Sequence, residues 1–252
     1  MNAKRFAATV SYDGTDFAGS QRQANDRTVQ GELETAAAAL FGAAVRVEMA
    51  GRTDSGVHAI GQVAAFSAET LLDPATVGRA LNAHLPADVA VRDVRDVPMG
   101  FDPRRWARRR WYRYTIWNQE ERAPLLRRTA WHTRGTLDLQ AMQTAADALP
   151  GRQDFMACSG TIEEGRTSVR TVFTTGWRCE NGVLLFDIEA DAFLPQMVRR
   201  LVGALVSVGR QSLEVEEFVR LLRQAEPGSL GPTAPALGLC LQRVWYDEGY
   251  VI

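Results

Sequence analysis

The sequence predicts an α+β protein whose two halves repeat one order of elements, β-α-β-β-α-β. Short runs with alternating apolar residues indicate strands, and apolar stripes at helical spacing, preceded by capping residues, indicate helices. The same order of elements then returns after about residue 104. We therefore expect a mixed, mainly antiparallel sheet flanked by helices, with a central cleft. The predicted halves are 1–103 and 104–252, and the sequence narrows the boundary only to between Asp96 and Arg110.

In the first half, apolar residues alternate from Phe6 to Tyr12, which predicts an opening strand. Thr28 is suited to cap a helix, and Asp73 followed by Pro74 marks the start of a second one. The predicted elements of this half are strands at 6–12, 45–49, 62–66 and 89–97, and helices at 28–41 and from 73 onward.

In the second half, the clearest local signal is Asn181-Gly182 between two alternating runs. This dipeptide is typical of a tight β-hairpin turn. The predicted elements are strands at 111–117, 171–179, 183–190 and 239–246, and helices at 138–149, 196–209 and 214–224.

Composition places the chain among ordinary globular proteins. Of its 252 residues, 46% are hydrophobic and 23% are charged, with a net charge of −1. No apolar run approaches the ~20 residues of a membrane span, and the first ten residues lack the apolar core of a secretory signal, so we expect a cytoplasmic protein with no membrane contact. The three cysteines are widely scattered, which predicts free, buried thiols rather than a zinc or redox site.

Positive charge is concentrated between Arg104 and Arg113, where six arginines alternate with two tryptophans and a tyrosine in RRWARRRWYR. Guanidinium groups interleaved with aromatic rings are typical of RNA-binding surfaces. However, Lys4 is the only lysine in the chain, so a preference for arginine partly explains the cluster. The pattern alone favours RNA contact and a solvated basic face about equally.

A polar loop from Gly51 to Ile60 places one carboxylate, Asp54, between two glycines. Gly51 and Gly56 permit backbone conformations closed to other residues and allow close approach of a ligand, and Arg52 can bind a negative charge. An ordinary surface turn would explain an isolated motif of this kind. The loop is nevertheless much longer than the two-residue turn at the corresponding place in the second half, which favours a functional loop.

A metal site is a weaker interpretation of the same loop. Asp54 and His58 are four residues apart, but the three histidines, His58, His84 and His132, lie far apart in the sequence without a metal-binding pattern. Each is predicted to be structural. The sequence also lacks the motifs of serine hydrolases, phosphate-binding loops and dinucleotide-binding folds. We therefore expect chemistry by a single acidic group with neither metal nor cofactor.

The segment AGRTDSGVHA, residues 50–59, resembles the catalytic motif of the A-type tRNA pseudouridine synthases. Further segments similar to motifs of this family follow in the family's order across nearly the whole chain. They are YDGTDFAGSQRQ (12–23), TVQGELE (28–34), WYRYTIWN (111–118), ADAFLPQMVRRLVG (190–203) and LGPTAPALGLCL (230–241).

The resemblance implies that Asp54 is the catalytic carboxylate, that Tyr112 lies against the target base, and that Arg199 pairs with Asp54. It implies that Arg52 binds the flipped nucleotide or its phosphates. Arg200, next to Arg199, is an alternative that the sequence leaves open. The implied activity is conversion of uridine to pseudouridine at positions 38, 39 and 40 of the tRNA anticodon stem-loop, by a homodimer that needs no cofactor.

Two positions depart from the family pattern. Ser20 stands where relatives usually carry tryptophan, and Leu194-Pro195-Gln196 stands where they often carry histidine. These departures concern contacts with tRNA and the choice of uridine rather than the reaction.

Three other functions remain compatible with the sequence. The chain could be a catalytically silent RNA-binding protein, a synthase acting at another RNA site, or a nucleosidase that breaks the same bond and releases uracil. Replacement of Asp54 distinguishes the silent RNA-binding protein. Mapping of the modified position distinguishes a synthase for another site, and detection of free uracil distinguishes a nucleosidase.

Overall fold

The computed structural model describes residues 3–159, 165 and 167–247, and confirms the α+β class. Ten strands and five α-helices are found in these residues. The chain divides into two compact units, formed by the described residues of Met1–Arg110 with Leu241–Ile252, and of Trp111–Cys240.

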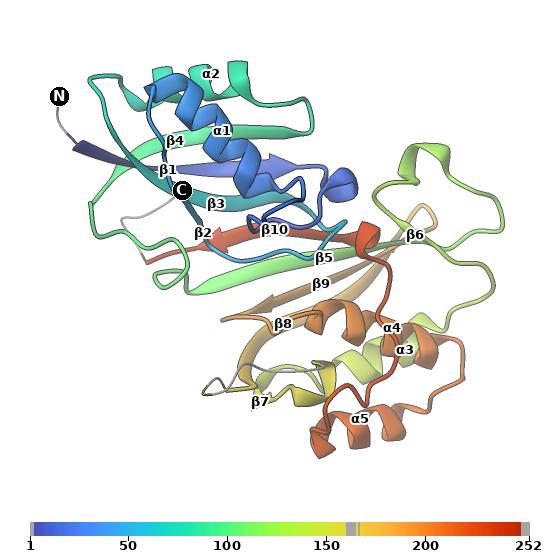
Figure 1. Ribbon diagram of the computed structural model, residues 1–252. Coiled ribbons are helices and arrows are strands. Elements are labelled where there is room, and N and C mark those ends of the chain that lie inside the picture. Colours follow the sequence, from blue (N-terminus) through green and yellow to red (C-terminus); the bar gives the residue numbers. More distant parts are fainter. Residues whose placement is uncertain (1–2, 160–164, 166, 248–252) are drawn as a thin grey trace. The chain divides into compact units, whose positions relative to one another are not determined.

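In the first unit, the strands follow the order β4-β1-β3-β10, and β2 pairs with β3. Strand β1 runs antiparallel to both β3 and β4. Helices α1 and α2 lie side by side in this unit (Figure 1). The bounds are β1 Ala3–Tyr12, α1 Val29–Phe41, β2 Val47–Met49, β3 His58–Glu69, α2 Pro74–His84, β4 Val89–Val97 and β10 Leu239–Trp245.

Both helices of the first unit begin where their capping residues predict. The Thr28 side chain accepts a hydrogen bond from the backbone N–H of Gly31, and Asp73 accepts one from Thr76, with Pro74 as the first helical residue. The apolar stripe of α1 includes Val29 and Leu33, both buried. The predicted starts of both helices are confirmed. The sequence could predict them because a capping residue bonds to the backbone only three residues away.

In the second unit, the strands follow the order β5-β9-β8-β7, with β6 parallel to β5. The hairpin between β8 and β9 turns at Asn181-Gly182, with φ values of 51° and 79°, as the dipeptide predicts. The bounds are β5 Arg109–Trp117, β6 Trp131–His132, α3 Leu139–Ala146, β7 Gly151–Asp154, β8 Val169–Glu180, β9 Val183–Ala190, α4 Met197–Gly209 and α5 Val215–Gln224. Short 3₁₀ turns occur at Gly14–Asp16, Pro124–Leu126, Met156–Cys158 and Ala236–Gly238.

Several expectations need correction. Among the predicted bounds, β1 begins at Ala3 rather than Phe6, and α3 ends at Ala146 rather than Leu149. Strand β3 begins at His58, four residues before the predicted Gln62, so the polar loop ends at Val57 rather than at Ile60. The short strands β6 and β7 were not predicted. Of the thiols expected to be buried, Cys158 is buried, but Cys240 is only partly buried and Cys179 is exposed.

Helix α4 packs closely on the segment that follows α5. A Cβ on Gly203 would lie 2.2 Å from the carbonyl oxygen of Pro232, which is far inside van der Waals contact. Gly203→Ala should therefore lower the free energy of unfolding by about 1–3 kcal/mol, the usual cost of overpacking. Urea unfolding would measure it.

Gly176→Ala is the matched control, because a Cβ there meets no atom within 4 Å. In the middle of a strand this change should be neutral or slightly stabilising. Equal stability of the two variants would show that the contact between α4 and Pro232 is not tight.

Candidate functional site

Asp54 lies on an eight-residue loop, Ala50–Val57, that joins β2 to β3. Its side chain is partly exposed, whereas the loop around it is held by the segment that follows β1. On the C-terminal side of Asp54, the Ser55 hydroxyl donates a hydrogen bond to the carbonyl of Phe17 at 3.0 Å. The Gly56 N–H donates to the same oxygen at 3.4 Å. Phe17 itself is buried. The loop after Asp54 is thus fixed to the folded body of the first unit.

The residue before Asp54 is held more tightly still. Thr53 is 7% exposed, and its hydroxyl shares a 2.8 Å hydrogen bond with the Tyr12 hydroxyl. Its N–H donates to the hydroxyl of Ser20 at 2.8 Å, and its carbonyl accepts from the N–H of Ser20 at 3.1 Å. Asp54 is therefore held from both sides by hydrogen bonds of its neighbours.

His58 has a structural environment. It is buried at the start of β3, and its Nδ1 accepts a 3.0 Å hydrogen bond from the backbone N–H of Gly14. The Asp13 carboxylate lies 3.2 Å from the same nitrogen. Across the described part of the chain, no cluster of three or more His, Cys, Asp or Glu side chains is arranged to hold a metal ion.

A close backbone approach next to His58 requires glycine. A Cβ on Gly14 would lie 2.0 Å from the carbonyl oxygen of Val57, the last residue of the loop. Gly19, with a φ of 123°, lies nearby, and a Cβ there would be 3.1 Å from the carbonyl oxygen of Thr53. Both ends of the segment after β1 thus lie directly against the Asp54 loop.

The beginning of the loop presents Arg52 to solvent. The carbonyl of Ala50 accepts from Arg110 Nη2 at 3.0 Å, and that of Gly51 accepts from Gln62 Nε2 at 2.9 Å. Arg52 itself is exposed. Arg52 is thus an exposed side chain on a loop whose backbone is held by Arg110 and Gln62.

The arginine cluster does not act as one patch. Arg108 pairs with Asp247 at 2.7 Å and holds the pKa of that carboxyl below its usual range, and Arg113 pairs with Asp187 at 2.9 Å. Arg110 supports the Asp54 loop, as described above. Arg104 and Arg105 are exposed. Arg105 Nε also lies 3.6 Å from the Asp102 carboxylate. The cluster thus combines ion pairs within the protein with exposed guanidinium groups.

In the second unit, Tyr112 lies on β5 and is 8% exposed. Its ring packs edge-to-face on Phe193, with the ring centroids 5.1 Å apart. Arg199 lies in the first turn of α4, where its Nε donates to the carbonyl of Ala234 at 2.9 Å and its own carbonyl accepts from the N–H of Ala234. Arg200, the alternative, donates instead to the carbonyl of Gly231 at 3.2 Å.

Tyr114 is a residue of this region that sequence reasoning missed. It is fully buried two positions after Tyr112 on the same face of β5, and its hydroxyl donates to the carbonyl of Pro235 at 2.7 Å. Burial raises the pKa of the phenol, and the positive charge of Arg199 opposes this shift. The alternation of WYRY in the sequence was the available signal, because it places both tyrosines on one face.

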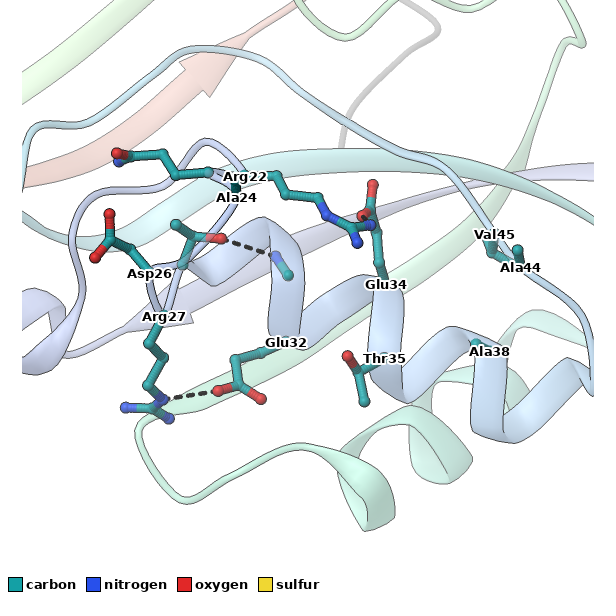
Figure 2. A pocket seen from close by; sticks show the side chains of 13 residues that line it. Arg22, Ala24, Asp26, Arg27, Glu32, Glu34, Thr35, Ala38, Ala44 and Val45 are labelled. Atoms are coloured by element: carbon teal, nitrogen blue, oxygen red, sulfur yellow. Dashed lines mark hydrogen bonds and ion pairs between the residues drawn. The ribbon is translucent and has the colours of Figure 1, made fainter.

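A polar pocket of about 450 Å³ is lined by α1, by residues between Arg22 and Thr28 before it, and by Ala44 and Val45 after it (Figure 2). Its arginines are paired: Arg22 with Glu34 at 2.6 Å, and Arg27 with Glu32 at 2.7 Å. Arg27 also donates a hydrogen bond to the Asp88 carboxylate. This bond holds the pKa of Asp88 below its usual range. These pairs fix the segment between Ser20 and α1.

The described helices include none with the length and apolarity required to cross a membrane.

The chain matches the family model described as tRNA pseudouridine synthase over residues 8–104 and 145–247. These ranges cover most of the sequence and include Asp54 and Arg199. The chain belongs to the tRNA pseudouridine synthase family, and it is thus an enzyme of the isomerase class.

Curated relatives narrow the assignment within this family. The chain is 39% identical to tRNA pseudouridine synthase A of Geotalea uraniireducens over 94% of this chain and 97% of that protein. It is 43% identical to tRNA pseudouridine synthase A of Chloroflexus aurantiacus, over 98% and 91% of the two chains. For the protein of the same name from Myxococcus xanthus, the identity is 41% over 97% and 93%. The resemblance seen in the sequence motifs is confirmed.

Proposed function

We propose that this chain converts uridine to pseudouridine at positions 38, 39 and 40 of the tRNA anticodon stem-loop, with Asp54 as the catalytic carboxylate. The observation that supports this most directly is the construction of the loop. Hydrogen bonds of Thr53 and Ser55 hold the backbone on both sides of Asp54, while Asp54 as a residue is partly exposed. Such preorganisation is what a reacting group needs.

The reaction is an isomerisation and needs no co-reactant. The bond between ribose C1′ and uracil N1 breaks, the base turns within the site, and C1′ joins C5. The hydrogen on C5 leaves as a proton, and N1 gains one, so no atoms are added or lost overall. In this proposal the ionised Asp54 acts as the nucleophile or the base of the reaction.

The other predicted residues serve the same bound nucleotide in this proposal. Tyr112 contacts the uracil ring, since an aromatic ring can stack on an extruded base. Arg52 binds the flipped nucleotide or its phosphates, for which a guanidinium is suited. Arg199 favours the ionised form of Asp54 through its positive charge.

The proposal includes tRNA as the partner, a homodimer as the active form and the cytoplasm as the place of action. Flipping a uridine out of a stacked stem costs a few kcal/mol. Contacts between arginines and the tRNA backbone would offset this cost. The exposed Arg104 and Arg105 are the residues we assign to such contacts.

The test is incubation of the purified full-length chain with tRNA that carries tritium at C5 of its uridines. We expect release of tritium without free uracil, and pseudouridine mapped to positions 38–40. Free uracil would instead indicate a nucleosidase, and pseudouridine elsewhere a synthase of different site specificity. Binding of tRNA without tritium release would indicate a silent RNA-binding protein. Each of these three outcomes overturns the proposal.

A further inference from the structure

Ser20 forms reciprocal hydrogen bonds with the residue that precedes Asp54. Its hydroxyl accepts from the N–H of Thr53 at 2.8 Å, and its own N–H donates to the carbonyl of Thr53 at 3.1 Å. Ser20 is 1% exposed. The two peptide groups that flank Thr53 are therefore both tied to one serine.

The other side of Ser20 is attached to helix α1. Its carbonyl accepts from the N–H of Gln30 at 2.9 Å, and the carbonyl of Gly19 accepts from the N–H of Val29 at 3.4 Å. These N–H groups belong to the first turn of α1, where the helix offers them no partner of its own. Ser20 thus connects the beginning of a helix to the loop.

This connection fixes the position of the backbone from which the Asp54 side chain extends. The peptide between Thr53 and Asp54 carries the carbonyl that bonds Ser20, so its orientation fixes the Cα of Asp54 relative to α1. The Thr53 N–H lies in a residue that is 7% exposed, and a buried donor that loses its acceptor is costly. Without the serine hydroxyl, that donor loses the acceptor it has in this structure.

We propose that Ser20 is a positioning residue for Asp54, acting through the backbone of Thr53. This inference rests on the proposed function of Asp54. It assigns a role in the turnover rate to a position where the resemblance to the family only indicated altered contacts with tRNA.

The experiment compares Ser20→Ala, which removes the acceptor, with Ser20→Thr, which keeps it, in the full-length chain. Thr175→Val is the matched control: it removes a partly buried hydroxyl that donates to the carbonyl of Ala146 at 3.1 Å, in the second unit. Tritium release from tRNA gives kcat and KM, at a temperature where circular dichroism shows every variant folded.

We expect Ser20→Ala to lower kcat by about 10- to 100-fold, the usual effect of displacing a catalytic group by a fraction of an ångström to 1 Å. KM should stay within about threefold, because the tRNA contacts are unchanged. Ser20→Thr should restore most of kcat, and Thr175→Val should match the wild type. If Ser20→Ala does not fold, Ser20→Cys takes its place. Cysteine is similar in size to serine but its thiol is a weaker acceptor, so we expect the same loss of kcat.

Three results would overturn the inference. One is a wild-type kcat in Ser20→Ala, or in Ser20→Cys if Ser20→Ala does not fold. Another is a change confined to KM, which would place Ser20 in tRNA binding. The third is equal losses in Ser20→Ala and Thr175→Val, which would indicate a general loss of stability. Absence of tritium release from the wild type itself would contradict the proposed function instead, so the two failures are distinguishable.

Discussion

Asp54→Asn is expected to abolish pseudouridine formation while the protein still folds and binds tRNA. Asparagine has the same size and preserves the backbone, including the carbonyl that accepts from the Val57 N–H at 3.1 Å. Its amide is neither a nucleophile nor a base at neutral pH. We expect the single-turnover rate to fall by at least about 10³-fold, in the range that mutation of an essential acid or base produces.

Asp26→Asn is the control for this substitution. It makes the same chemical change on an exposed carboxylate of the same unit, beside the pocket of Figure 2, and should leave the rate unchanged. Tritium release gives the rate, and filter binding gives the affinity for tRNA. A rate for Asp54→Asn close to that of Asp26→Asn would contradict the assignment of the catalytic group.

Gly14→Ala is the second substitution for which we expect a large effect. The added Cβ would lie 2.0 Å from the carbonyl oxygen of Val57, so one of the two backbones has to move. The same glycine donates its N–H to His58 at 3.0 Å, and movement would strain that bond as well. We expect a loss of about 1–3 kcal/mol in the free energy of unfolding. Turnover should fall by about 100-fold, because the loop of Asp54 is displaced.

Gly100→Ala provides the comparison, since a Cβ there meets no atom within 4 Å. Urea unfolding followed by circular dichroism measures stability, and tritium release measures turnover. Wild-type values of both quantities in Gly14→Ala would mean that the loop does not depend on this close approach.

The elements that the sequence predicts best are those determined by local interactions. Thr28 and Asp73 cap helices through residues three positions away, and Asn181-Gly182 adopts a turn that depends on its own backbone angles. The Asp54 loop was also recognisable, because its glycines and its length are properties of the chain. For the caps and the hairpin turn, the stabilising partner lies within a few residues.

The features that the sequence did not reveal depend on distant partners. Strand β3 begins early because Ala59 pairs with Tyr12 of β1, and no local pattern signals that pairing. The role of Ser20 depends on Thr53, which lies 33 residues away. The ion pairs of Arg108 with Asp247 and of Arg113 with Asp187 could not be predicted either, because their partners lie 139 and 74 residues away. The first compact unit likewise includes the described residues of Leu241–Ile252, and chain order does not indicate this grouping.

The central claim is that Asp54, held by its loop, converts uridine to pseudouridine in the anticodon stem-loop. The most direct measurement is nucleoside analysis of one tRNA sample after incubation with the wild type, Asp54→Asn or Asp26→Asn. We predict pseudouridine at positions 38–40 with the wild type and Asp26→Asn, and unchanged uridine with Asp54→Asn. Pseudouridine formed by Asp54→Asn at the wild-type rate would contradict the claim.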